Sequence, residues 1–462
     1  MLQELTQPQP HATAGASIWG RAHRQLTIGL ILTVSGTAFE ALAVATTLPA
    51  TVRDLGGLAL YGWAFSAFML ANLIGIILTG ATADRHGPAR PFLLGSGVFV
   101  LGLLAVGLAP SMPAVIAGRA VQGFGAGVLS SVAYVTIGRG YPEALKPRML
   151  AVVSSAWVVP GLVGPAAAGL IADSVGWRWV FLGLVPLVLC GAALALPGLR
   201  GLAGSGQGSR EWATSLAALA LAGGAGLALA GLSGGPLPLR AALIVAGLAL
   251  ALPALRRLLP PGTLRAAPGL PAAVAAHGLL NLAFFGVDSF IPLALTSRGQ
   301  SASLAGLALT AATLTWTTGS WVQAHLAARQ SRRVMVVAGL ALIALGSAGI
   351  AATQAALAPL LLAPLAWGVA GLGMGIAFST NALVVLEAAP PGQEGSASSA
   401  LQLANVLGVA LGAGLGGAII GGASTAAGVS QAGLLTQDAI MIGVALAGML
   451  VARRLPSRAP QR

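Results

Sequence analysis

Two acidic residues, Glu40 and Asp288, lie deep inside long apolar stretches of the sequence, and no other Asp or Glu is placed in this way. A charge at the centre of a bilayer costs about 2.5–3.5 kcal/mol on insertion scales, so an acid kept there is a candidate for function. Burial also disfavours the ionised form of a carboxyl group. These residue types therefore favour proton binding, in competition with a cation, inside a membrane.

A basic residue, Arg119, also lies within an apolar stretch. An arginine at such a depth needs an ionic partner or a water-filled cavity. With a helical rise of about 1.5 Å per residue, Arg119 lies about 9 Å and Glu40 about 14 Å from the same membrane surface. These depths allow a direct or water-bridged pair. The alternative is that Arg119 extends to the membrane surface and only anchors its helix.

The composition identifies a membrane protein. The chain is 56% hydrophobic and 8% charged, with a mean hydropathy of +0.87, whereas soluble domains carry about 25% charged residues. The net charge is +13, and nineteen of the 24 Lys and Arg residues fall on one side of the membrane, with four on the other and Arg119 inside a helix. Such an asymmetry marks the cytoplasmic side, so we expect the lipid bilayer and not nucleic acid as the partner.

The cysteine and histidine content argues against disulfides and metals. The single cysteine, Cys190, allows no intrachain disulfide. The five histidines show no metal-ligand spacing. We expect no metal and no cofactor.

Fourteen apolar runs are long enough to cross a bilayer, which takes about 20 residues in a helix. An even number places both termini on the basic, cytoplasmic side, and we expect a multi-pass protein of the inner membrane of a prokaryote. The runs cover residues 26–49, 61–83, 91–110, 113–138, 149–172, 178–197, 213–232, 239–258, 270–296, 303–327, 333–353, 357–384, 396–421 and 436–453.

Two linkers set apart an inserted pair of helices from two six-helix bundles. Residues 199–211 are rich in Gly and Ser, and residues 256–269 are basic and rich in Pro. The expected division is a cytoplasmic tail (1–25), an N-terminal bundle (26–200), the central loop with two inserted helices (201–268), a C-terminal bundle (269–455) and a second tail (456–462).

The two bundles resemble each other. Residues 118–165 and 366–413 share Gly and Pro at a constant offset of 248, as Gly125 and Gly373 illustrate. Glu40 and Asp288 fall at matching places in the first helix of each bundle. Parallel halves with a substrate site between them are a known transporter design. The sequence thus predicts an all-α membrane protein with two pseudo-twofold related six-helix bundles.

The loop after the second predicted helix reads GATADRHGPAR at residues 80–90. It resembles the signature loop of the major facilitator superfamily, whose members move one half against the other. That resemblance implies a gating role for this loop, although Thr82, Pro88 and Ala89 depart from the family pattern. The residues assigned to gating are Gly80, Asp84, Arg85, Gly87 and Arg90.

Two further helices carry superfamily motifs. Residues 118–127 read GRAVQGFGAG and resemble the fourth-helix motif, in which the family's arginine is thought to take part in proton coupling. The resemblance assigns proton coupling to Glu40, Arg119 and Asp288. Residues 160–169 read PGLVGPAAAG and resemble the fifth-helix motif of the superfamily's antiporters, which implies export. The motif residues are Pro160, Gly161, Gly164, Pro165 and Gly169.

Two other segments are similar to the fourteen-helix drug:proton antiporter branch. Residues 39–49 read FEALAVATTLP and residues 176–186 read GWRWVFLGLVP. The resemblance implies alternating access, a small-molecule substrate exchanged for protons, and a protein that acts as a monomer. A flat apolar or cationic ligand would stack on aromatic side chains. Candidate cavity residues are Trp157, Asn281, Phe285, Trp316 and Phe378.

Other functions stay open at this point. A dedicated exporter of one metabolite, lipid or antibiotic would have the same sequence features. A proton-coupled nutrient symporter is disfavoured by the fifth-helix motif. A membrane-embedded enzyme is disfavoured because the sequence contains no HExxH, no G-x-S-x-G and no phosphate-binding loop.

Overall fold

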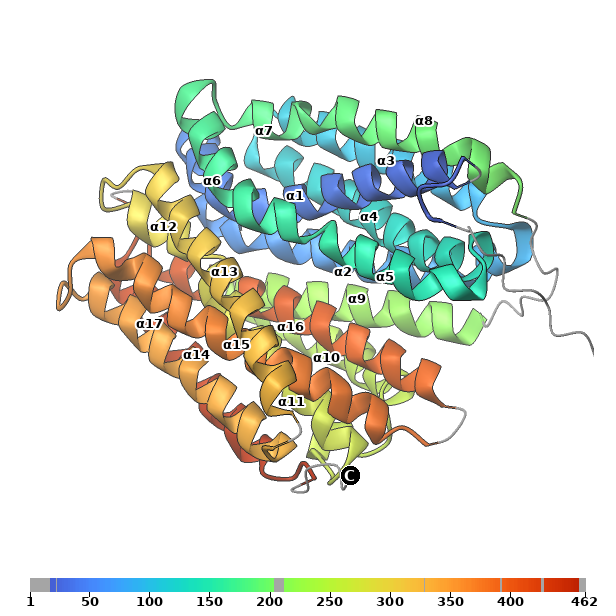
Figure 1. Ribbon diagram of the computed structural model, residues 1–462. Helices are drawn as coiled ribbons and strands as arrows, with labels where there is room; N and C mark the ends of the chain where they lie inside the picture. Colours follow the sequence, from blue (N-terminus) through green and yellow to red (C-terminus); the bar gives the residue numbers. More distant parts are fainter. Residues whose placement is uncertain are drawn as a thin grey trace, which may run out of the picture.

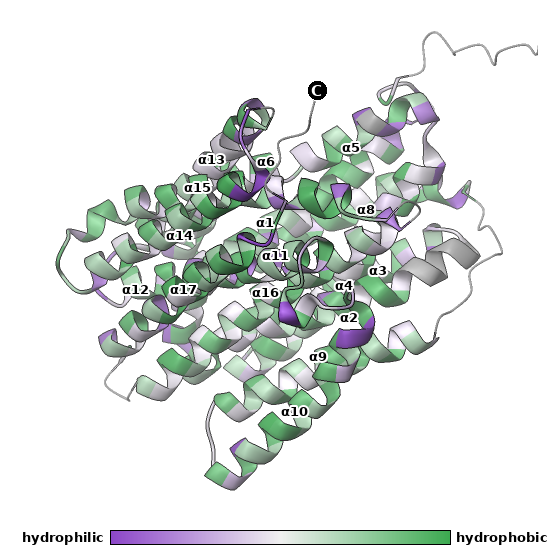
Figure 2. Cartoon of the chain, turned by 90° about the horizontal axis from the view of Figure 1, so that it is seen from below, coloured by the Kyte–Doolittle hydropathy of each residue, from purple (hydrophilic) through white to green (hydrophobic). Residues whose placement is uncertain are grey.

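The computed structural model describes residues 17–21, 23–202, 212–327, 329–390, 393–424 and 428–456, with the backbone alone for residues 80–86 and 147. Throughout these residues the regular structure is helical. Figure 2 shows hydrophobic residues along the helices and hydrophilic residues mainly in loops and at helix ends. This distribution is what a chain that spans a bilayer requires, because backbone polar groups in lipid must be paired within the helix.

The first bundle places Glu40 near the middle of an unbroken helix. We call the side on which α1 begins and α17 ends the terminal side, and the opposite side the far side (left in Figure 1). The helices of this half are α1 (Arg24–Leu55), α2 (Tyr61–His86), α3 (Ala89–Gly107), α4 (Met112–Gly140), α5 (Lys146–Ser155), α6 (Val158–Ser174), α7 (Arg178–Leu182) and α8 (Leu184–Arg200).

The second bundle repeats this plan after an inserted pair. The pair is α9 (Trp212–Leu232) and α10 (Leu237–Leu258). The second half consists of α11 (Leu270–Asp288), α12 (Ile291–Thr296), α13 (Ala302–Leu326), α14 (Arg332–Gln354), α15 (Ala363–Glu387), α16 (Glu394–Ala423) and α17 (Gln431–Ala452).

Thirteen segments of the described chain are long and apolar enough to cross a membrane. The predicted span at 303–327 is the fourteenth long helix, α13, which has 25 residues and carries several threonines. Hydroxyls of Thr313, Thr315 and Thr317 donate to the carbonyl oxygens four residues earlier. This local pairing satisfies polar groups within the helix itself.

Glycines allow equivalent helices of the two halves to pack closely. A Cβ on Gly123 or Gly127 would lie 2.0 or 2.2 Å from a carbonyl oxygen of α2. In the second half, a Cβ on Gly371 or Gly375 would lie 2.2 or 2.1 Å from a carbonyl oxygen of α13. Small residues at these positions let backbones touch. Close packing at these small-residue pairs is therefore common to both halves.

The halves meet through α2 with α16 and through α6 with α13. On the far side, Tyr61 Oη donates to Ser289 O (3.1 Å), and Asp173 Oδ2 accepts from the backbone nitrogen and Oγ of Ser303 (3.2 and 2.9 Å). These hydrogen bonds close the junction on the far side, where α6 and α13 lie side by side (Figure 1).

The inserted pair lies against this junction. Helix α9 packs against α2 of the first half and α16 of the second. Trp63 Nε1 in α2 donates to Ser233 Oγ (3.1 Å) just after α9. Helix α10 packs mainly on α9 and leaves large apolar side chains such as Leu237 and Val245 exposed, which suits contact with lipid.

Parts of the predicted domain division lie outside the described residues. These parts are residues 1–16 and 457–462 of the two tails and residues 203–211 of the central loop. The boundaries assigned to the five segments stay a prediction.

Candidate functional site

A buried ion pair occupies the core of the first half. Glu40 in α1 and Arg119 in α4 are each 1% exposed, and Arg119 Nη1 donates to Glu40 Oε1. The guanidinium also donates from Nε to Ala64 O (3.0 Å) and from Nη1 to Gln122 Oε1 (3.1 Å). Its Cζ lies 4.2 Å from the ring centroid of Phe68. Four groups therefore contact the Arg119 guanidinium.

The sequence allowed Arg119 either to pair with an acid or to extend to the membrane surface. The guanidinium points into the bundle and binds the acid, so it does not extend to the membrane surface. A buried pair with good hydrogen bonds is compensated, whereas removal of one partner leaves an uncompensated charge that costs about 3–5 kcal/mol. Glu40 Oε2 has no hydrogen-bond partner among the described residues, so one carboxyl oxygen remains free to accept a proton.

Asp288 occupies the matching place in the second half, but its partner is neutral. Asp288 is the last residue of α11, and its Oδ1 accepts from Trp367 Nε1 of α15 (2.7 Å). The two contacts join residues 79 positions apart in both halves, so Trp367 stands where the first half has Arg119. None of the ion pairs found within the described residues involves Asp288. Its carboxylate lacks the counter-charge that Glu40 has.

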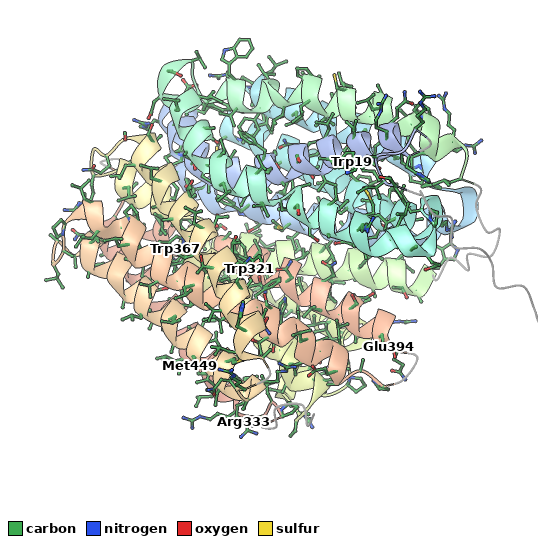
Figure 3. The ribbon with its side chains drawn as sticks, viewed as in Figure 1. Trp19, Trp321, Arg333, Trp367, Glu394 and Met449 are labelled. Carbon is green, nitrogen blue, oxygen red and sulfur yellow. The ribbon has the colours of Figure 1, made fainter. Side chains whose placement is uncertain are left out.

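A connected group of aromatic rings leads to Asp288 within the second half. We call it the aromatic cluster. Figure 3 labels Trp367, whose side chain lies in this half toward the far side. The rings belong to α11, α13 and α15, and they are His277, Phe284, Phe285, Trp316, Trp367 and Phe378.

The ring contacts in the cluster run in an unbroken series. His277 and Phe378 have centroids 4.7 Å apart, and Phe378 lies 5.4 Å from Trp316. Trp316 lies 5.6 Å from Phe284, which stacks on Trp367 at 4.8 Å. Tilted and edge-on arrangements at these distances are favourable for aromatic pairs. The cluster offers stacking surface beside an acid with no cation of its own.

The predicted cavity residues are only partly brought together. Phe285, Trp316 and Phe378 belong to the aromatic cluster and are half-buried. Asn281 is fully buried one turn from Phe285, and its Nδ2 donates to His277 O (2.8 Å). Trp157 lies between α5 and α6 with 45% of its surface exposed and makes none of the ring contacts of the cluster.

The antiporter motif of α6 lies at the contact with α13. A Cβ on Gly161 would lie 2.6 Å from Thr313 Cγ2, and a Cβ on Gly169 would lie 2.7 Å from Ala302 O. Pro165 O would lie 2.3 Å from a Cβ on Gly306 of α13. The predicted span at 149–172 is divided into α5 and α6 at Ser155–Val158, just before Pro160 and Gly161. The motif thus lines the junction between the halves.

The predicted gating loop is described only in part. The side chains of Gly80, Asp84 and Arg85 lie outside the described residues, and their backbone forms the last turns of α2. Gly87 follows the helix with φ +82, a left-handed conformation that favours glycine. Arg90 is exposed in the first turn of α3. The role assigned to the loop stays a prediction.

Sequence reasoning missed two residues. Asp438 lies at the edge of a predicted span and was not singled out, yet it is a buried acid with 1% of its surface exposed. Helix α17 begins at Gln431, five residues before the predicted span, which places Asp438 two turns inside. The N-cap Ser430 was the signal for this earlier start. Trp367 was also missed, although the repeat offset pointed to it.

Among the described residues, no group of three or more His, Cys, Asp or Glu side chains is placed to hold a metal ion. The described side chains of the site can support proton exchange on carboxyl groups, ion pairing and aromatic stacking.

Sequence comparisons agree with this architecture. The model of the Major Facilitator Superfamily matches residues 28–413. A probable multidrug-efflux transporter of Mycobacterium tuberculosis is 30% identical over 395 residues, which cover 81% of this chain and 82% of the relative. A methylenomycin A resistance protein of Streptomyces coelicolor is 30% identical over 421 residues, which cover 86% of this chain and 87% of the relative.

Solved structures show the same fold at low sequence identity. An auto-inhibited peptide transporter of the POT family superposes with a TM-score of 0.66 at 18% identity, covering 95% of this chain and 98% of that chain. A mutant of the nucleoside transporter NupG superposes with a TM-score of 0.65 at 14% identity, covering 93% of this chain and 99% of that chain. The chain belongs to the Major Facilitator Superfamily, and it is a multi-pass membrane transporter and not an enzyme.

Proposed function

We propose that this protein is a proton-coupled secondary transporter that exports hydrophobic or cationic drugs in exchange for protons by alternating access. The observation that carries this proposal is the pair of acids at equivalent places in the two halves. Glu40 is neutralised by Arg119, whereas Asp288 has a neutral partner and an aromatic cluster beside it. The relatives named for multidrug efflux support the direction and the substrate class.

The proton step is assigned to the Glu40–Arg119 pair. A proton that binds Glu40 removes the charge that holds Nη1 of Arg119 and leaves the guanidinium on Ala64 O, Gln122 and Phe68. The positive charge then lacks a counter-ion in a low-dielectric core, which favours rearrangement of α1 against α4. Protonation is in this way converted into a change of helix packing.

The substrate step is assigned to the aromatic cluster with Asp288. A flat apolar cation can stack on the rings of Phe285, Trp316 and Phe378 while its charge approaches the carboxylate. The same carboxylate can instead take up a proton. Proton and cationic substrate therefore compete for Asp288, which couples release of one to binding of the other.

The membrane potential can drive the exchange of a proton for a neutral substrate, because one net charge then crosses the membrane. The exchange of one proton for a monovalent cation moves no net charge and is driven by the pH gradient. One charge crossing 100 mV gains about 2.3 kcal/mol. Because about 1.4 kcal/mol corresponds to a factor of ten, this amounts to roughly a fiftyfold gradient of a neutral substrate per proton.

The proposed orientation places the terminal side in the cytoplasm of a prokaryote, with the protein in the inner membrane as a monomer. Basic residues cluster on that side, and Arg333 and Arg454 illustrate it with bonds to Leu455 O and Arg265 O (Figure 3 labels Arg333). In this orientation the closed far side faces outward.

The test uses purified protein in liposomes loaded with a pH-sensitive dye. Addition of a lipophilic cation should release protons from the protein-containing vesicles, and an imposed pH gradient should drive accumulation of the cation. A flux of the cation that is independent of the pH gradient would contradict proton coupling. A proton flux in the same direction as the substrate would indicate symport.

A dedicated exporter of one antibiotic is the second candidate, and the relative named for methylenomycin A resistance favours it. A panel of structurally unrelated cations separates the two proposals. Transport of several panel members supports a multidrug exporter, and transport of one alone supports a dedicated exporter.

A further inference from the structure

Asp438 is a buried acid that the proposed exchange does not use. It lies two turns inside α17 from the far side, about 10 Å from the helix end at about 1.5 Å per residue. The residue is 1% exposed, and neither carboxyl oxygen has a hydrogen-bond partner among the described residues. A polar group buried without a partner is costly, and an ionised carboxylate more so. We therefore expect the buried carboxyl group of Asp438 to bind a ligand.

Acceptors outnumber donors around Asp438. The Gln354 side chain lies beside the carboxyl group, and its amide Nε2 is a donor on that side. Gln354 Oε1 and Gln437 Oε1 are buried acceptors without a donor, like the two carboxyl oxygens of Asp438. The nearby amide of Gln437 is committed, since its Nε2 donates to Gly286 O (2.6 Å). A further hydrogen-bond donor would therefore be satisfied at this site.

No charge compensates Asp438. It is the only charged residue of α17, which packs on α11, α14 and α16. Within the described residues, none of the ion pairs includes it. Arg298 is committed to the end of α14, where it donates to Thr353 O and Gln354 O. The charged and titratable groups of the packed helices are His277 and Asp288 on α11, Arg332 and Arg333 at the opposite end of α14, and Glu394 at the opposite end of α16.

We propose that Asp438 is a proton-binding site of the second half, separate from Glu40 and Asp288. A proton from water adds to one carboxylate oxygen and forms a neutral carboxylic acid. The new O–H is a further donor, and Gln354 Oε1, a buried acceptor without a donor, lies beside the carboxyl group to receive it. The proposal rests on the proposed transport function for the statement that this proton is exchanged during transport. Proton binding itself is measurable without transport.

Gln354 lies between the site and the far side. Together with Thr353 at the end of α14 and with Ile291 and Leu295 of α12, it lines a small recess on that side that has no space for a water molecule. Gln354 thus borders both this recess and the neighbourhood of Asp438. In the proposed orientation this is the outer side, from which the protons that drive export arrive.

The direct test is infrared spectroscopy of the purified protein, which detects the C=O stretch of a protonated carboxyl group. At neutral pH, the wild-type protein minus Asp438→Asn difference spectrum should show this band. The Glu40→Gln variant should retain it. Asp173→Asn removes an exposed acid of the same side and should leave the band unchanged. Thermal unfolding of each variant in detergent verifies that it folds.

Two outcomes overturn the proposal. A difference spectrum without the band means that Asp438 is ionised. Loss of the band when Na⁺ replaces K⁺ at constant pH means that the ligand is a metal cation. A band that shifts in Gln354→Leu supports the hydrogen bond between Gln354 and the protonated acid. If the band is present but wild-type flux ignores the pH gradient, the proton site stands and the proposed transport function fails. If flux is coupled to the pH gradient and the band is absent, the proposed transport function stands and the proton site at Asp438 fails.

Discussion

At the scale of residues, the acids at equivalent positions of the two halves have different partners. Glu40 with Arg119 and Asp288 with Trp367 are joined across the same sequence separation of 79. The first contact is an ion pair, and the second is a hydrogen bond to a neutral indole. Replacement of a cation by an indole at an equivalent position leaves one acid free to interact with protons or cationic ligands.

The buried ion pair should show strong coupling in a double-mutant cycle. Arg119→Met leaves Glu40 without compensation and should lower the free energy of unfolding by about 3–5 kcal/mol. The double variant with Glu40→Gln should recover most of that loss, because it removes both charges. Thermal unfolding in detergent measures the effect. Additive losses in the double variant would show that the two side chains do not act as a pair.

Asp288 should determine preference for cations. Asp288→Asn keeps the shape of the side chain and removes its charge, so affinity for a lipophilic cation should fall about tenfold or more, equivalent to about 1.4 kcal/mol. Affinity for a neutral analogue of the same shape should change little. The matched variant Trp367→Phe keeps the acid and should keep the preference. Equal loss for the cation and its neutral analogue would contradict this role.

The sequence predicted part of the site, and the reasons for the rest are physical. Depth along a helix predicted the partner of Arg119, because an ion pair needs two charges at one level of the membrane. The partner of Asp288 is neutral, so charge gave no signal for Trp367. Asp438 was missed because the predicted span starts five residues after α17 does. The sequence therefore placed this acid near the membrane surface, where a charge has little cost.

At the scale of elements, glycines control how closely the halves approach. On α13, Gly306 faces Pro165 of α6, and a Cβ there would lie 2.3 Å from the carbonyl oxygen of Pro165. Backbone atoms cannot yield as the end of a side chain can. Closure of the far side therefore depends on the absence of a side chain at this position.

Gly306→Leu should prevent closure of the far side and stop transport. The test adds Gly306→Leu to a protein in which Cys190→Ser removes the native thiol and Ser303→Cys introduces one on the far side. If the far side opens, the new thiol should react faster with a membrane-impermeant reagent. The expected increase is about tenfold or more, which corresponds to about 1.4 kcal/mol. Gly97→Leu in α3 is the matched control, because a Cβ there meets nothing within 4 Å. An unchanged labelling rate in Gly306→Leu would contradict this role for the glycine.

Helix positions were predicted well where apolar runs are continuous and less well where they are interrupted. The run at 149–172 reads as one span, but the chain breaks into α5 and α6 before Pro160. The run at 270–296 ends its first helix at Asp288. Hydropathy carries no information on such breaks, since the residues on both sides are apolar.

At the scale of the whole molecule, the fold follows from its repeat. Two bundles of one plan, joined by an inserted pair, bury their small-residue faces against each other and present apolar side chains outward. Helix α9 packs on α2 and α16, the pair that joins the halves. The inserted pair therefore contacts both halves at the junction where they would move against each other.

The orientation is testable on the intact molecule. Basic residues on the terminal side predict a cytoplasmic C-terminus. A fluorescent protein that matures only in the cytoplasm, fused after residue 462, should be fluorescent, and alkaline phosphatase fused there should be inactive. The same reporters inserted after residue 234, between α9 and α10, should give the opposite result. Active phosphatase at the C-terminus would contradict the orientation.

The central claim is that a proton on Glu40 drives transport, and counterflow in liposomes tests it most directly. Vesicles of the Glu40→Gln variant should exchange labelled for unlabelled lipophilic cation at near the wild-type rate, because substrate binding and movement of the halves remain. The same vesicles should fail to accumulate the cation when a pH gradient is imposed. Accumulation driven by the gradient at the wild-type rate in Glu40→Gln would contradict the account.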